Sequence, residues 1–169
     1  MNKWFNVDEK TIGIKYKLYG EYITLLFDKE DYSLVSKLIF KVCTNGYVQC
    51  REKLTKNKYV MYHDLLINPP INKEIDHING IKWDNRKINL RICTHAQNQK
   101  NSKSLIKKYK GVYKDNFTIP GKIKYYAQIK VNGKNKHIAY CKSEREAAIA
   151  YNEAARKYHG EFACLNIIE

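Results

Sequence analysis

The spacing of hydrophobic and polar positions changes several times along the first part of the chain, and each change predicts a new element. Residues 11–27 mix alternating with continuous apolar positions, a pattern typical of strands. Residues 28–40 start with acidic side chains and continue with apolar pairs at helical spacing, which predicts a short helix. Residues 42–51 enclose an Asn-Gly pair, the strongest short hairpin signal, and residues 58–67 are expected to be extended.

A strand, a loop, a second strand and a helix are predicted in close succession within residues 74–101. Residues 75–78 form the first strand, Asn79-Gly80 the turn that follows, and residues 89–93 the second strand. A capping-box pair after the second strand starts a helix at His95. This order would bring the first turn of the helix beside the first strand.

The polar, basic segment 101–111 lacks apolar periodicity and is expected to be a linker. After it, a short strand is followed by a hairpin over residues 124–141, with Asn132-Gly133 as its turn. Residues 143–160 open with a capping box, carry alanine and tyrosine on one face and stop at a glycine. They predict a helix that lies close against a small sheet, because its apolar face is mostly alanine.

These elements predict an α+β protein with two modules, residues 1–104 and residues 105–169. A chain of 169 residues is long enough for two small domains with cores of their own. In the first module, a region of small strands leads into the strand, loop, strand and helix. The second module is a three-stranded antiparallel sheet packed on one helix.

Charge and cysteine usage narrow the class of partner. The chain has 31 Lys and Arg against 17 Asp and Glu, a net charge of +14, which favours a polyanionic partner such as nucleic acid. No membrane partner is expected, since no apolar run approaches the length of a spanning helix and the first residues do not form a signal peptide. Five cysteines without a C-x-x-C pair exclude a zinc ribbon or disulfide framework and predict an intracellular, cytoplasmic setting.

Four polar residues between 76 and 98 have the chemistry that phosphodiester hydrolysis requires. His77 is the candidate general base, because a neutral imidazole takes a proton from water at cellular pH. Asp76 and Asn98 offer oxygen ligands to a hard cation, and Asn89 offers a carbonyl that would fix the tautomer of His77. Because strand neighbours point to opposite faces, Asp76 and His77 can serve one phosphate only where the strand ends or twists.

The remaining histidines leave one alternative open. His95 lies one helical turn before Asn98 and is the rival metal ligand, although a solvent-facing or DNA-contacting role is also expected for it. His63 is expected to be structural. His137 and His159 lack a nearby ligand partner, so neither is predicted to bind metal.

The pattern of residues 74–101 resembles the HNH, or ββα-metal, endonucleases, in particular the phage and intron-homing branch. The resemblance extends upstream over most of residues 20–101, with the ββα-metal core at about 74–103. It implies Asp76 and Asn98 as metal ligands, His77 as general base and Asn89 as the orienting group. Many members have histidine where Asn98 stands, so one Mg²⁺ or Mn²⁺ per site is expected rather than Zn²⁺. The pattern D-H-I-N-G…D-N-R…N-L-R…T-H-x-Q-N is carried by Asp76, His77, Ile78, Asn79, Gly80, Asp84, Asn85, Arg86, Asn89, Leu90, Arg91, Thr94, His95, Gln97 and Asn98.

The resemblance implies a DNA endonuclease of homing or mobile-element type, encoded by a phage, a virus or another mobile element. Double-stranded DNA is the expected partner, with Arg86 or Lys87 holding a flanking phosphate and no small-molecule cofactor. A monomer that nicks one strand is the simpler expectation, with a weak dimer as the alternative. Two other functions stay open, a non-cleaving sequence-specific DNA-binding regulator and an RNA-binding protein.

The second module is strongly basic and rich in tyrosine. Between Lys100 and Lys142 there are twelve lysines and a single acid, Asp115, which predicts salt-sensitive binding to phosphates. Residues 110–166 resemble the APETALA2/ethylene-response-factor DNA-binding domain through the G-V, E-A-A-x-A-Y-N-x-A-A and G-x-x-A-x-L-N elements. Since its usual arginines are mostly replaced, the resemblance implies the fold more than the target sequence. It implies DNA contacts at Lys110, Tyr113, Lys114, Gln128, Lys130, His137 and Tyr140.

Overall fold

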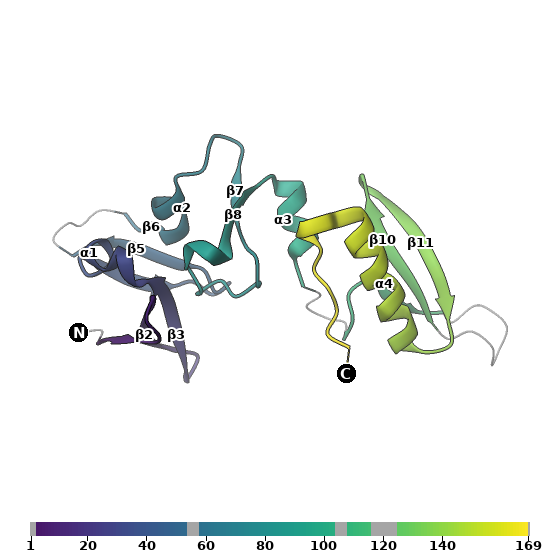
Figure 1. Ribbon diagram of the computed structural model, residues 1–169, viewed down its shortest axis with the longest axis horizontal. Coiled ribbons are helices and arrows are strands. Elements are labelled where there is room, and N and C mark those ends of the chain that lie inside the picture. The colour runs from purple at the N-terminus through teal and green to yellow at the C-terminus, as the bar shows by residue number, and fades with distance from the viewer. Residues whose placement is uncertain (1–2, 54–57, 104–107, 116–124, 169) are drawn as a thin grey trace. The chain divides into compact units, whose positions relative to one another are not determined.

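The chain folds as two compact units, residues 1–95 and residues 96–169 (Figure 1). Each unit combines small antiparallel sheets with short helices, which confirms the α+β class. The linker expected near residue 105 and the boundary after residue 104 lie outside the described residues. The computed structural model describes residues 3–53, 58–103, 108–115 and 125–168.

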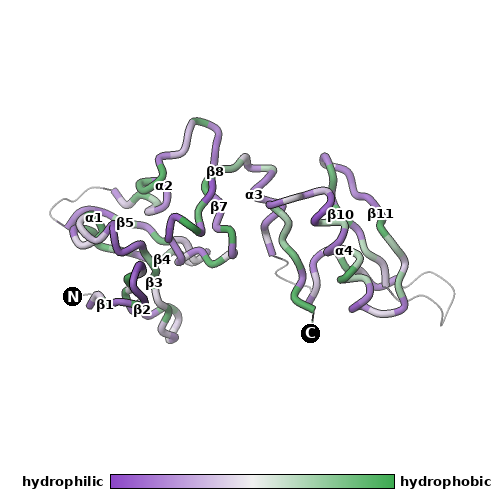
Figure 2. The backbone as a smooth tube through the Cα atoms, viewed as in Figure 1, coloured by the Kyte–Doolittle hydropathy of each residue, from purple (hydrophilic) through white to green (hydrophobic). Residues whose placement is uncertain are grey.

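The first unit opens with a three-stranded antiparallel sheet in the order β1-β2-β3. Segment 11–27, expected as strand, is a hairpin, because Tyr19 and Gly20 adopt positive φ angles of 49° and 92° and reverse the chain. The first four residues of β2 are all buried, whereas buried positions alternate along the second half of β3. Figure 2 shows hydrophobic and hydrophilic residues interspersed in this part of the chain. The strands are β1 (Trp4–Asn6), β2 (Thr11–Leu18) and β3 (Glu21–Asp28).

A second three-stranded sheet, β4-β5-β6, follows two short helical turns. The expected hairpin around Asn45-Gly46 is confirmed, with Val42 paired to Val48 and Gly46 at a φ of 88°. The elements are η1 (Lys29–Asp31), α1 (Tyr32–Val35), β4 (Leu38–Val42), β5 (Val48–Glu52), β6 (Val60–Met61) and α2 (Tyr62–Ile67).

Two expectations in this region were wrong. The helix expected over residues 28–40 ends at Val35, because Leu38 and Phe40 alternate into the core as part of a strand. Most of the segment 58–67, expected to be extended, is helix α2. Its neighbours Tyr62 and His63 are both buried, which a strand with one covered face does not allow.

An aromatic cluster joins the two sheets of the first unit. Phe27 lies 4.9 Å from Phe40 and 5.1 Å from Tyr62, measured between ring centroids, and Trp4 contacts both phenylalanines. Edge-on aromatic packing of this kind favours fixed relative positions. It therefore anchors α2, which in turn packs against the strand that carries Asp76 and His77.

The strand, loop, strand and helix predicted around residues 74–101 are present. The two strands pair antiparallel, with Asp76 opposite Arg91 and His77 opposite Leu90. The loop between them docks on β3, since the amide of Leu26 donates to the carbonyl of Trp83 at 3.0 Å and the amide of Asn85 donates back to Leu26 at 3.0 Å. The elements are β7 (Glu74–His77), η2 (Lys87–Asn89), β8 (Leu90–Cys93) and α3 (His95–Asn101).

The second unit contains the predicted three-stranded sheet, in the order β11-β10-β9, with α4 packed on one face (Figure 1). Ser143 caps α4 as expected, because its hydroxyl accepts a hydrogen bond from the amide of Glu146 at 3.1 Å. The Glu146 carboxylate reaches back to the amide of Lys142, at 3.0 Å, one residue before the position that a capping box uses. Ala147, Ala154 and Ala155 are buried against the sheet, as expected for a helix that lies close to it. The elements are β9 (Val112–Lys114), β10 (Tyr125–Val131), β11 (Lys134–Cys141), α4 (Glu144–His159) and η3 (Gly160–Phe162).

Replacing Gly111 with alanine is expected to destabilise the second unit by about 3 kcal/mol, from positive-φ strain and overpacking combined. Gly111 has a φ of 72°, and an added Cβ would overlap the ring of Tyr151 and lie 2.7 Å from the carbonyl oxygen of Gln128. Gly133→Ala is the matched control, because its φ is 79° but no atom lies within 4 Å of the added Cβ. Amide hydrogen exchange of α4 would measure both, and equal losses of protection would contradict the steric argument.

Candidate active site

His77 lies at the end of β7 in a buried pocket of polar groups. Its side chain is 4% exposed, and Nε2–H donates to Oδ1 of Asn85 at 3.3 Å. This bond places the proton on Nε2 and the basic lone pair on Nδ1. Burial and the proximity of His63 lower the pKa of His77 to about 4, despite opposing contributions from Asn85 and nearby acids. The imidazole is therefore neutral at cellular pH, as a general base must be.

Asp76 precedes His77 and is held by an arginine on the neighbouring strand. Its Oδ2 accepts hydrogen bonds from Nε and Nη2 of Arg91 at 2.8 and 2.6 Å. Both Asp76 and His77 are buried, although neighbours on a strand point to opposite faces. The strand ends directly after His77, whose carbonyl accepts the amide of Gly80 at 2.8 Å. The strand end required by the sequence argument is thus present.

Asn89 closes the loop that follows β7. Its Oδ1 accepts the amide of Asn79 at 2.9 Å, and its Nδ2 donates to the carbonyl of Asp84 at 2.8 Å. The amide within hydrogen-bonding distance of the His77 ring is that of Asn85, which sequence analysis did not single out. Asn85 is the middle residue of the D-N-R triplet and is fully buried, so the triplet was the available signal.

Asp84 and Arg86 form a bidentate ion pair within the loop. Arg86 donates from Nε and Nη2 to the two carboxylate oxygens of Asp84 at 2.8 and 2.7 Å, and Asn79 donates to the same carboxylate at 2.9 Å. Burial acts to raise the pKa of Asp84, but the hydrogen bonds and charge of Arg86 outweigh it and leave the pKa lowered. The guanidinium expected to hold a DNA phosphate is therefore bound to a carboxylate of its own chain.

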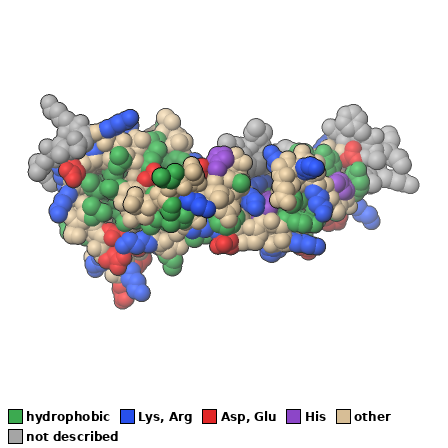
Figure 3. Space-filling view, turned by 90° about the horizontal axis from the view of Figure 1, so that it is seen from above, with side chains coloured by type: hydrophobic (Ala, Val, Ile, Leu, Met, Phe, Trp, Pro, Cys, Tyr) green, Lys and Arg blue, Asp and Glu red, His purple; other side chains and the backbone are tan. Residues whose placement is uncertain are grey.

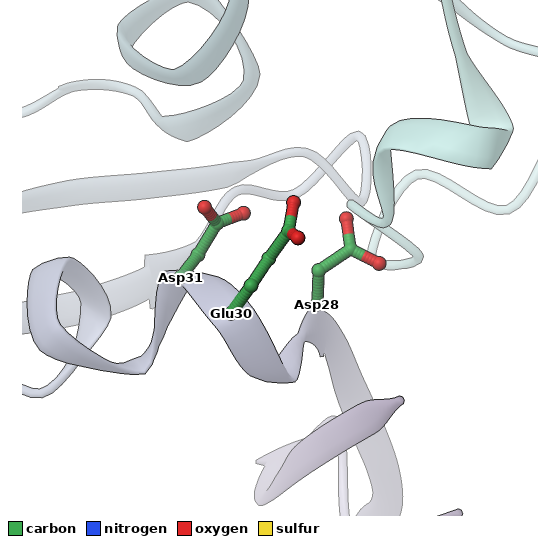
Figure 4. Close-up of side chains that lie close together, drawn as sticks. All are labelled: Asp28, Glu30 and Asp31. Carbon is green, nitrogen blue, oxygen red and sulfur yellow. The ribbon is translucent and has the colours of Figure 1, made fainter. Parts of the chain in front are cut away.

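Lys87 is paired in the same way, with a group of three acids at the end of β3. Its ammonium lies 2.6 Å from Oε1 of Glu30 and 2.8 Å from Oδ1 of Asp31, and its amide donates to Asp28 at 2.7 Å. Figure 4 shows the three carboxylates pointing to the same side of the chain. Hydrogen bonds and charge from these acids raise the pKa of Lys87. The acidic group is thus bound by the ammonium and the backbone amide of Lys87, and these contacts anchor the loop that contains η2.

The two candidate ligands on α3 have different settings. His95, the rival ligand, places Nδ1 2.7 Å from Oε1 of Glu74, and its side chain is largely exposed. Asn98 belongs to the second unit, and its pairing with Asp76 stays a prediction.

The metal-free protein is expected to lose stability as the pH falls from about 6.5 to about 4. Burial lowers the pKa of His63, His77 and His159 in the folded state, whereas unfolded imidazoles titrate near 6.5. Below about 6.5 the unfolded chain therefore binds more protons, which favours unfolding by about 3 kcal/mol from His77 alone. Urea unfolding in EDTA at a series of pH values measures the slope. His77→Gln should reduce it, and an unchanged slope would contradict this account.

One face of the second unit's sheet carries a row of aromatic rings. Tyr113 and Tyr126 are stacked, with centroids 5.2 Å apart and an interplanar angle of 14°. Tyr126 also contacts His137 at 5.9 Å and Tyr140 at 6.2 Å. The row spans all three strands, while α4 covers the opposite face. Because the rings stack on one another, they leave mainly their edges and polar atoms toward solvent.

Cationic and amide side chains lie beside this aromatic row. Tyr113, Gln128 and Lys130 line a cavity of about 500 Å³ in the second unit. Lys110 lines it too, but its ammonium donates to the carbonyls of Lys100 and Ser102, both at 2.6 Å, and burial lowers its pKa. Figure 3 shows Lys and Arg side chains scattered over the visible face rather than gathered in one patch.

A buried Asp-His pair thus lies at the end of β7, beside a loop that is closed by hydrogen bonds of Asn89. The HNH endonuclease family matches residues 68–100 of the chain. An uncharacterized HNH endonuclease of Acanthamoeba polyphaga mimivirus is 31% identical over 152 residues, which cover 89% of this chain and 77% of that relative. The chain therefore belongs to the HNH endonuclease family, for which DNA is the substrate. No solved structure matches the chain. Among the helices described, none has the length and apolar character needed to cross a membrane.

Proposed function

We propose that the protein is a divalent-metal-dependent DNA endonuclease of homing or mobile-element type. The observation that carries the proposal is the buried, neutral imidazole of His77 directly after the buried carboxylate of Asp76. A neutral imidazole accepts a proton from water, and a carboxylate is a preferred ligand of hard cations. The two side chains therefore supply a base and a metal ligand at one strand end.

In this proposal Nδ1 of His77 accepts the proton of the attacking water, while Nε2–H stays hydrogen-bonded to Oδ1 of Asn85. Arg91 holds Oδ2 of Asp76 and so fixes the orientation of the carboxylate. Asp76 and the amide oxygen of Asn98 are the proposed metal ligands. A donor set made only of oxygen fits Mg²⁺ or Mn²⁺, which supplies charge that stabilises the leaving oxygen when bound.

The phosphate-holding role expected for Arg86 and Lys87 is not part of the proposal. Each would first have to leave its own carboxylate partners, Asp84 for Arg86 and both Glu30 and Asp31 for Lys87. Desolvated bidentate pairs such as Arg86–Asp84 are costly to break. Both residues are therefore assigned to holding the loop that carries Asn85.

Incubation of the full chain with supercoiled plasmid and Mg²⁺ or Mn²⁺ tests the proposal. Conversion to nicked or linear DNA is expected, with loss of conversion in EDTA and recovery on adding excess metal. Cleavage that persists in EDTA would overturn the metal requirement. A gel shift without any cleavage in either metal would instead favour a non-cleaving DNA-binding regulator.

We further propose that the sheet of the second unit binds double-stranded DNA through the aromatic row and its neighbours. Edges of tyrosine and histidine, with Gln128 and Lys130, suit contacts to phosphates and base edges in a groove. Lysine contacts should make the affinity fall steeply with salt concentration. Tyr113, Lys114, His137 and Tyr140 are the other proposed contacts on this sheet.

Tyr126→Ala is expected to weaken binding to duplex DNA by about 10-fold, because Tyr126 contacts three other rings of the row and its loss disorders them. Fluorescence anisotropy with a labelled duplex measures the affinity. Tyr22→Ala is the matched control, since Tyr22 is an exposed strand tyrosine of the first unit. Equal affinities for the Tyr126 and Tyr22 variants would argue against DNA binding by this face.

A further inference from the structure

Two aromatic rings, those of His63 and Tyr47, pack against the ring of the proposed base. His63 on α2 lies perpendicular to His77, with ring centroids 5.3 Å apart and an interplanar angle of 90°. Tyr47, from the turn before β5, lies 5.4 Å from the His63 ring and 5.8 Å from the His77 ring. The ammonium of Lys82 sits 4.4 Å from the centroid of Tyr47. Each ring of the triangle therefore comes from a different part of the fold and contacts the other two.

The polar atoms of His63 contribute little to holding it in place. Nδ1 is buried without a hydrogen-bond partner, and Nε2 lies 3.5 Å from a carboxylate oxygen of Asp64, whose side chain is half exposed. An unsatisfied buried nitrogen costs about 1–3 kcal/mol, so the site would be more stable with an apolar ring. His63 therefore acts on its neighbours mainly through the packing of its ring and not through a hydrogen bond.

We propose that His63 is a positioning residue that fixes the plane of the His77 ring. The His63 ring packs perpendicular to His77 and contacts Tyr47 on another side. It thereby keeps Nε2–H of His77 hydrogen-bonded to Oδ1 of Asn85 and leaves the lone pair on Nδ1. The inference rests on the proposed role of His77 as base. Misplacement of a reacting group by about 1 Å costs on the order of 100-fold in rate, so a packing contact at this position affects catalysis directly.

Two substitutions separate ring shape from ring chemistry. His63→Phe keeps a flat ring and removes the unpaired nitrogen, so its kcat for plasmid cleavage should stay near wild type and its stability should equal or exceed wild type. His63→Leu fills the space with a flexible side chain, so kcat should fall by about 10- to 100-fold with KM for DNA unchanged. A Leu variant with wild-type kcat overturns the proposal, and so does a Phe variant whose kcat falls by more than about 10-fold.

The tautomer of His77 gives a second readout that does not depend on cleavage. Long-range ¹H–¹⁵N spectra should show the proton on Nε2 in the wild type and the Phe variant, and a mixture of tautomers in the Leu variant. A single Nε2–H tautomer in the Leu variant would count against positioning.

His159→Leu provides the matched control for general destabilisation. His159 is also buried with an unpartnered Nδ1, but it lies on α4 in the second unit, so its replacement should leave kcat unchanged. If the wild type does not cleave DNA with Mg²⁺ or Mn²⁺, the proposed function fails. If His77→Ala cleaves as fast as the wild type, the role of His77 as base fails, and with it the reason for positioning it. If His77→Ala is inactive and His63→Leu is fully active, only the positioning role of His63 fails.

Discussion

Replacing His77 with alanine is expected to lower the rate of metal-dependent DNA cleavage by at least about 100-fold, since a positioned general base contributes about 100- to 10,000-fold. The imidazole is neutral at cellular pH because burial lowers its pKa to about 4, and its tautomer is fixed by the bond to Asn85. Alanine provides no proton acceptor, whereas the carboxylate of Asp76, the proposed metal ligand, and the proposed DNA-binding sheet are unchanged. Initial rates on supercoiled plasmid measure the effect, and anisotropy on a duplex should show unchanged affinity.

His77→Gln is the companion variant. Glutamine is polar and of similar size but cannot accept a proton at this pH, so it should be as inactive as alanine while unfolding more like the wild type. Trp4 and Trp83 both lie in the first unit, so tryptophan fluorescence reports whether that unit is folded. The lowest expected loss is about 100-fold. A folded Gln variant whose activity stays within about 10-fold of the wild type would therefore rule out His77 as the base.

Replacing Arg86 with alanine is expected to destabilise the first unit by about 2–4 kcal/mol, because removal of one partner strands a buried charge. Asp84 is 1% exposed, and Arg86 donates two hydrogen bonds to its carboxylate. Without the guanidinium, the effect of burial on Asp84 would be opposed by the hydrogen bonds from Asn79 and from the backbone amide of position 86, and the charge and side-chain hydrogen bonds of Arg86 would be lost. The loop carrying Asn85 should loosen as a result. Urea unfolding followed by tryptophan fluorescence measures the change in the free energy of unfolding.

Lys87→Ala is the matched control for this prediction. Lys87 is the next cation in the chain and is also paired with acids. Its ammonium and the Glu30 carboxylate are solvent-exposed, and the side chain of its other partner, Asp31, is 14% exposed, against 2% for that of Asp84. Exposed ion pairs contribute little because water and salt screen them, so a much smaller loss is expected. Similar losses for both variants would show that burial of Asp84 does not decide the stability of the loop.

Elements that depend on short stretches of sequence were predicted well. Asn45-Gly46 and Asn132-Gly133 predicted the β4–β5 and β10–β11 hairpins, and Ser143 predicted the start of α4. The β2–β3 hairpin was not predicted, because its turn at Tyr19-Gly20 lacks an Asn-Gly signal. Helix α2 was missed because the apolar run at 58–67 has no clear period, and only the burial of Tyr62 and His63 distinguishes helix from strand.

The candidate site was predictable in its residue types but not in all its contacts. Asp76 and His77 were predicted from the motif, and the structure places both in a buried setting. The contact of Asn85 with His77 depends on Leu26, which is distant in sequence and holds the Asn85 backbone.

Lys87 is paired with Glu30 and Asp31, which lie 57 and 56 residues away in the sequence, so this pairing leaves no trace in local spacing. Arg86 is paired with Asp84, two residues before it, and local spacing alone does not tell such a pair from a cation that is free to hold a DNA phosphate.

The pairing of the β7–β8 loop with β3 limits how far the chain can be truncated without loss of activity. The segment 68–100 that matches the family contains His77, Asn85 and Asn89, but it lacks Leu26. The backbone of Leu26 bonds to the carbonyl of Trp83 and to the amide of Asn85. A peptide reduced to that segment would keep these side chains but lose the β3 backbone that holds the loop in place. A minimal active fragment therefore has to start upstream of β3.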